Sequence, residues 1–185
     1  MSDPCRPYRQ LARNALLANR RLHLACADLR AGEWAAERVS FFPSIEATMN
    51  HILVVGRFYG DALQGGTLGV AVFADEVPCR SAASLAVAQQ AVDLKLLAFC
   101  DELSAEGLGA AVLIHRTGRV QVDTVADTLM HLFLHDQHHR GHVHAMLAGS
   151  SVRPPQLDEF FMGDDARARV GDLAALGKGE AWVMR

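Results

Sequence analysis

Apolar and polar positions alternate along the 185-residue chain in a pattern that predicts long helices separated by connectors rich in Pro and Gly. After Pro7, the stretch "YRQLARNALLANRRLHLACADL" has apolar residues at helical spacing, which predicts a helix ending before Gly32. A second helix is expected to begin after Ser44, which suits an N-cap, and to end at about Leu63, before two glycines at 65–66.

Two further helices are expected in the second half of the chain. The Ala- and Leu-rich segment Ser81–Glu102 predicts the third, and a fourth starts near residue 123 or 124 and ends at Leu147. Between them, β-branched residues flank Thr117 and Gly118, a pair typical of a turn, and this predicts a small hairpin or extended excursion.

Four long helices with these connectors predict an all-α protein, a four-helix bundle, whose interior commonly holds metal sites built from facing helices. We expect the bundle domain to span residues 1–162. Residues 163–185 follow a Pro-Pro break and carry short apolar clusters. They are expected to form a C-terminal extension, with a short helix packed on the bundle.

Composition narrows the classes of protein. Half of the residues are hydrophobic, the net charge is −3, and the 18 basic residues are scattered, so nothing predicts a surface that follows a nucleic-acid backbone. The N-terminus is polar, and every purely apolar stretch is far shorter than the roughly 20 residues of a bilayer crossing. We expect a soluble, cytoplasmic protein without a signal peptide, whose partners include neither nucleic acid nor a membrane. Its four widely spaced cysteines suit reduced thiols.

The segment "HLFLHDQHHRGHVHAML", residues 131–147, holds six of the nine histidines. On a helical wheel of about 100° per residue, five histidines share one side, and His144 does not. The core-facing stripe of that wheel consists of Val125, Leu129, Leu132, Val143, Met146 and Leu147. His139 lies inside the stripe and His135 at its edge. The other three, His131, His138 and His142, lie further toward solvent.

A metal ligand must be desolvated and must share its ion with another element, and residues at i and i+4 project together from one helix face. His135 and His139 meet both conditions, although a solvated or packed histidine face remains the alternative. In the second helix His51 lies outside the polar arc, so it needs a hydrogen bond or a metal. His23, beside two arginines, is expected to be an ordinary helix residue, and His115 is given no site role.

Two motifs carry a family resemblance. "TMNHILVVGRFYGDAL" and, about eighty residues later, "LMHLFLHDQHHRGHVHAMLAGSSVRPPQLD" resemble the DinB family, also called DinB/YfiT-like metalloenzymes, over roughly Tyr8–Phe161. The resemblance implies a four-helix bundle, commonly dimeric, with a divalent metal such as zinc or nickel. The implied ligands are His51, His135 and His139, the three histidines that the wheels select.

The second motif also departs from the family, which commonly has Gln where this chain has His142. We expect His142 to lie at the surface or beside the ligands, and the roles of His131 and His138 stay open. Arg140 is expected to pair with a carboxylate. Gly141 is expected to allow close approach of another helix.

The resemblance implies a metal-dependent enzyme that acts on small molecules, of the type that transfers a low-molecular-weight thiol such as bacillithiol or mycothiol to an electrophile. A related group isomerises or hydrolyses small molecules, so a hydrolase is the other activity that the resemblance implies. Three imidazoles leave coordination positions open, as in catalytic zinc sites, but they do not identify the metal. Two alternatives stay open: a non-catalytic metal-binding or stress-response protein, and a helical protein whose histidines form only a polar face.

Overall fold

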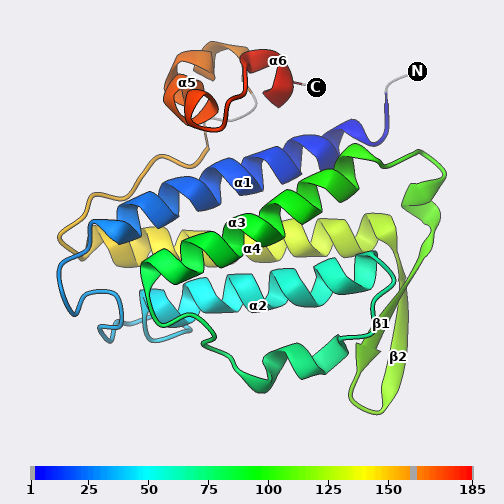
Figure 1. The fold of residues 1–185 in the computed structure, drawn as a ribbon, viewed down its shortest axis with the longest axis horizontal. Helices are drawn as coiled ribbons and strands as arrows, with labels where there is room; N and C mark the ends of the chain where they lie inside the picture. The colour runs from blue at the N-terminus through cyan, green and yellow to red at the C-terminus, as the bar shows by residue number, and fades with distance from the viewer. Residues whose placement is uncertain (1–2, 159–161, 185) are drawn as a thin grey trace.

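The computed structural model describes residues 3–158 and 162–184, and its centre is a bundle of four long helices (Figure 1). Their bounds are α1 Arg6–Ala27, α2 Ile45–Leu63, α3 Ala82–Asp101 and α4 Val125–Ala148. α1 and α2 each pack against both α3 and α4. The expected all-α four-helix bundle is therefore confirmed, and each long helix lies within a few residues of its predicted position.

Hydroxyl side chains fix the starts of three of these helices. Ser44 accepts a hydrogen bond from the backbone N–H of Ala47, Ser81 does so from Ser84, and Thr124 caps α4. Each bond satisfies one of the backbone donors that a helix leaves free at its N-terminus. These caps are local features, which is why the sequence predicts the helix starts closely.

α2 and α3 run in the same direction, and the segment between them crosses the length of the bundle (Figure 1). It contains the 3₁₀ helix η1, Gly69–Ala74. The two helices approach closely at Gly56, where an added Cβ would lie 3.0 Å from a methyl group of Val92. Glycine at this position keeps α2 close to α3, and so helps to set the position of α2 in the bundle.

The expected hairpin connects α3 to α4. After the short 3₁₀ helix η2, Gly107–Gly109, strand β1 (Ala111–Arg116) pairs antiparallel with β2 (Arg119–Thr124). Gly118 in the turn has a φ of +71°, a left-handed conformation that glycine adopts without steric cost. The hairpin extends beyond one end of the bundle, and Val112 and Ile114 of β1 join the core.

The C-terminal segment packs on α1 (Figure 1). It forms the 3₁₀ helix η3 (Gly163–Asp165) and helices α5 (Ala166–Ala175) and α6 (Glu180–Val183). Leu173 and Val183 pack against Leu17 of α1, and Asp172 forms ion pairs with Arg20 and Arg21. The boundary expected at residues 162 and 163 stays a prediction, and residues 159–161 lie outside the described part of the chain.

Among the described residues, one helix, α3, is long and apolar enough to cross a membrane by length and composition alone, and about a third of its window is buried. Core helices of soluble proteins have the same length and composition, so these two properties of α3 are weak evidence for a membrane span. All four cysteines are buried and free. That state agrees with the reduced thiols expected from the sequence.

Candidate metal centre

Three histidines from two helices meet inside the bundle. His51 lies on α2, and His135 and His139 lie one turn apart on α4. Their nearest ring nitrogens all lie within 4.8 Å of one another, and the Nε2 atoms of His51 and His135 are 2.9 Å apart. We call these residues the inner trio. The structure thus brings together the three ligands that the sequence predicted, while their role in binding a metal stays a prediction.

Burial keeps two members of the inner trio, His51 and His139, neutral. His139 is 6 % exposed, and burial, followed by the charges of His135, His51, His138 and His142, lowers its pKa to about 3. Burial, followed by the neighbouring His135, lowers the pKa of His51 to about 4. At neutral pH both rings therefore carry a lone pair that is free of a proton, which is the form that binds a metal.

The spacing of the inner trio fits a metal ion. Two lone pairs that face each other at 2.9 Å repel, so without an ion one of the Nε2 atoms must carry a hydrogen. Two imidazole nitrogens at about 2.0–2.1 Å from one ion, and about 90° apart, are separated by about 2.9 Å. In addition, the Nδ1 atom of His139 is buried and has no hydrogen-bond partner among the described residues. The donors present are three neutral imidazoles, which suit zinc, nickel, copper or iron.

A carboxylate positions His135. The Nδ1 atom of His135 lies 3.4 Å from Oδ1 of Asp136, a long hydrogen bond that favours a proton on Nδ1 and leaves Nε2 free to bind. Asp136 is 3 % exposed, and its charge interacts with the fully buried Arg140. Arg140 also donates to Oδ1 of Asn19 on α1, at 3.4 Å. The expected pairing of Arg140 with a carboxylate thus takes the form of a charge interaction inside the core.

Sequence reasoning missed Asp136, although a signal was present. On the helical wheel Asp136 falls at about 140° from His131, within the core-facing stripe. A carboxylate in that direction must be buried, so it needs a hydrogen bond or an opposite charge. The same reasoning would have connected it to His135, the ligand next to it.

An aromatic residue covers the inner trio. The ring of Phe42, in the connector before α2, lies 4.3 Å from the ring of His51 and 5.6 Å from that of His139, measured between centroids. On the other side, His131 lies between His135 and Tyr59, with centroid distances of 6.3 and 5.1 Å. These contacts leave His131 close to the trio but outside it.

Arg116 adds a positive charge to this side. It donates to the hydroxyl of Tyr59 at 3.1 Å and lies over the ring of Phe58. Arg116 comes from β1, so the hairpin brings a cation to the end of the bundle where Tyr59 and His131 meet. A negatively charged group of a small molecule bound at the trio would find a partner there.

Three residues outside the inner trio, His23, Gly141 and His142, can be compared with the sequence predictions. His23 lies in α1, as expected, but it is only 7 % exposed and neither ring nitrogen has a hydrogen-bond partner among the described residues. Gly141 is exposed, and an added Cβ would meet nothing within 4 Å, so the prediction of close helix approach there is wrong. His142 is half-buried beside the trio, as expected.

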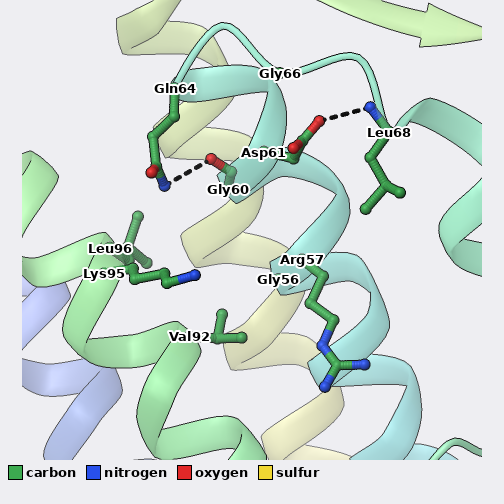
Figure 2. Close-up of a pocket in the computed structure, with 10 residues that line it drawn as sticks. All are labelled: Gly56, Arg57, Gly60, Asp61, Gln64, Gly66, Leu68, Val92, Lys95 and Leu96. Atoms are coloured by element: carbon green, nitrogen blue, oxygen red, sulfur yellow. Dashed lines mark hydrogen bonds between the residues drawn. The ribbon is translucent and has the colours of Figure 1, made fainter.

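A separate hollow lies between α2 and α3 (Figure 2). Arg57 and Lys95 flank it, and its volume is about 400 Å³. Asp61 and Gln64 in its wall are already bonded, to the N–H of Leu68 and the carbonyl of Gly60. Its lining contains no histidine, so this hollow is not part of the metal centre.

The fold and the site together define a four-helix bundle with a cluster of three histidines that could hold a metal ion. The sequence model of the DinB family matches residues 1–169, so the chain belongs to the DinB family. The match continues past Phe161 into the start of α5. None of the curated proteins compared with the chain matches it.

One solved structure is similar, the crystal structure of a DinB-like protein from Bacillus cereus ATCC 10987. It is 16 % identical, and the alignment covers 75 % of this chain and 89 % of that chain with a TM-score of 0.57. At this identity the likeness supports the fold alone.

Proposed function

We propose that the protein is a divalent-metal-dependent enzyme that acts on small molecules by transferring a low-molecular-weight thiol to an electrophile. The observation that carries the proposal is the inner trio, in which His51 of α2 meets His135 and His139 of α4 within 4.8 Å. Three protein ligands leave positions for water or substrate, as in catalytic zinc sites. The thiol comes from the family resemblance, and zinc or nickel is the expected metal.

The proposal gives a role to the inner trio and to three residues around it, Asp136, Phe42 and Arg116. When bound, the metal supplies a Lewis acid that favours the thiolate form of the thiol. His51, His135 and His139 hold the metal, and Asp136 keeps His135 in the tautomer that can bind it. Phe42 excludes water from one side. Arg116, bonded to the Tyr59 hydroxyl, attracts an anionic group of the thiol or of the electrophile.

The proposal is tested by elemental analysis of the purified protein together with an assay of thiol consumption. The wild type is expected to contain metal and to consume bacillithiol or mycothiol in the presence of an electrophile. The double variant His135→Ala, His139→Ala is expected to lose both properties. His144→Ala serves as the control, because His144 lies on the same helix but outside the trio. Equal metal content in the double variant and the wild type would reject the proposal.

One feature favours a second function, that of a non-catalytic metal-binding protein. The trio joins α2 to α4, so a bound ion would connect two helices and stabilise the bundle. This function predicts a large loss of thermal stability on chelation and no thiol-dependent turnover. The enzyme proposal predicts turnover that stops on chelation. The family resemblance also leads us to propose a homodimer, and sedimentation analysis would test the oligomeric state. The widely spaced cysteines lead us to propose a cytoplasmic location.

A further inference from the structure

A second group of histidines lies on the solvent side of the inner trio. His138, His139 and His142 each offer a ring nitrogen, and these nitrogens lie within 4.8 Å of one another. The ring centroids of His138 and His142 are 4.3 Å apart, and those of His139 and His142 are 5.5 Å apart. We call this group the outer trio. Burial increases across the outer trio: His138 is exposed, His142 is half-buried and His139 is buried.

A ring nitrogen of the outer trio is buried without a partner among the described residues. The Nδ1 atom of His142 is inaccessible to solvent, and no described residue forms a hydrogen bond with it. A buried imidazole nitrogen without a partner is costly, so a ligand that binds there is favoured. His142 is also the position where the motif departs from the family's Gln. A groove of about 520 Å³ opens beside it, lined by Arg38, Val39, Ser40, Phe41, His142, Ala145, Met146 and Gly149.

We propose that the outer trio is a second divalent-metal site, which receives an ion from solvent before the ion moves to the inner trio. His138 and His142 are one turn apart and provide a pair of nitrogens that solvent can reach through His138. His139 belongs to both trios. An ion held by the outer trio therefore already touches a ligand of the inner one.

The shared histidine decides how the two sites are filled. To bind two ions at once, the His139 ring would need both nitrogens free of protons, and two dications would lie across one imidazole and repel. The outer trio therefore binds most strongly when the inner trio is empty. Wild-type protein is expected to bind one ion tightly and a second at least tenfold more weakly.

The proposal is tested first where the inner trio cannot compete. In the double variant His51→Ala, His135→Ala, zinc titrated into metal-free protein is expected to bind with one ion per chain, more weakly than to the wild type. Adding His138→Gln and His142→Gln is expected to weaken this binding at least tenfold. The matched control adds His131→Gln and His144→Gln instead, which lie on the same helix outside the outer trio, and should leave binding unchanged.

Zinc binding that is equal with and without His138 and His142 would overturn the proposal, and so would a double variant that binds no zinc. Neither result bears on the enzyme proposal, which depends on the inner trio in the wild type. If the double variant does not fold, the second measurement uses His138→Gln, His142→Gln alone. Cobalt uptake by this metal-free variant is expected to be at least fivefold slower than by the wild type, with one tight ion still bound at equilibrium. Unchanged uptake would overturn the proposal.

Discussion

Polar groups buried around Asp93 are paired between α1 and α3, whereas several polar groups between α2 and α4 lack a matching partner among the described residues. Between α1 and α3, the carboxylate of Asp93 accepts hydrogen bonds from the side-chain amides of Asn19 at 3.0 Å and Gln89 at 2.8 Å. Between α2 and α4, the nitrogens of His51 and His135 face each other, and Nδ1 of His139 has no partner among the described residues. Donors and acceptors that match one another stabilise a fold. Ring nitrogens between α2 and α4 have lone pairs without a matched donor among the described residues, and a metal ion could bind them.

Arg140 connects the two sides. Its guanidinium is buried and interacts through charge with the carboxylates of Asp136 and Asp93; burial lowers its pKa, while both carboxylates raise it. Burial also raises the pKa of Asp93 to about 7, against its bonds to Gln89 and Asn19, which lower it. Arg140 forms no direct ion pair among the described residues but connects the two networks: it donates a hydrogen bond to Asn19 and interacts through charge with Asp136, which in turn bonds to the candidate ligand His135.

The largest effect is expected from Arg140→Met, which leaves Asp136 buried without its opposite charge. Removing one partner of a direct buried ion pair destabilises a protein by about 3–5 kcal/mol, and this is the upper bound for Arg140, which interacts with Asp136 through charge alone. Urea unfolding of the metal-free protein should show this loss in the free energy of unfolding. Arg119→Met, in the exposed turn of the hairpin, is the control and should change it by less than about 0.5 kcal/mol. A loss of similar size in both variants would mean that the network contributes little.

Acid should act on His23 of α1, whose two ring nitrogens have no hydrogen-bond partner among the described residues. Burial lowers its pKa to about 4 in the folded protein, against 6.5 as the ordinary value. As the pH falls from 6.5 to 4, the unfolded chain takes up a proton that the folded chain excludes. Stability is therefore present above pH 6.5 and is lost on acidification, by up to about 3 kcal/mol.

His23→Leu removes this proton uptake and both unpartnered nitrogens. Its free energy of unfolding should depend less on pH between 6.5 and 4 than that of the wild type, and should be about 1 kcal/mol higher at pH 7. Urea unfolding at a series of pH values measures both effects. His144→Leu is the control. A His23→Leu variant that keeps the full acid loss would show that another group causes it.

A smaller effect is expected from Phe42→Ala, which opens the histidine side to water. The pKa of His51 is lowered first by burial, so exposure should move it from about 4 back toward 6.5. NMR titration of the histidine rings in metal-free protein measures this shift. Phe41→Ala is the matched control, because Phe41 is 80 % exposed and lies one residue away. An unchanged His51 pKa would mean that Phe42 does not shield the trio.

The smallest effect is expected from Gly141→Ala. Gly141 is exposed inside α4, and an added Cβ meets nothing within 4 Å, so alanine should stabilise the helix by up to about 1 kcal/mol. Thermal unfolding should show a higher midpoint, and zinc affinity should not change. Gly56→Ala, where the Cβ would lie 3.0 Å from Val92, is expected to show the opposite sign. If Gly141→Ala were destabilised, another part of the protein would have to contact this position.

How far the sequence predicts this molecule depends on how local each feature is. The helix starts at Ser44, Ser81 and Thr124 were predictable because each cap bonds within its own segment. Helical direction, with the family resemblance, also singled out His135 and His139. Phe42 could not be predicted, because it lies in a connector without periodicity and reaches the trio only through the tertiary fold.

The burial of His23 was hidden for a similar reason. Its neighbours Arg20 and Arg21 both pair with Asp172 of the C-terminal segment, which packs on α1. An ion pair with a residue some 150 positions away leaves no trace in local periodicity. The missed features are thus those that need contacts distant in the chain.

The central claim is that His51 of α2 completes one metal site with His135 and His139 of α4. Zinc titration of metal-free wild type, His51→Ala and His131→Ala tests it most directly, since His131 lies near the trio but outside it. Wild type and His131→Ala should bind one tight ion per chain with similar affinity, and His51→Ala should bind about 100-fold more weakly, since one of three ligands is lost. Tight binding by His51→Ala that equals the wild type would contradict the account.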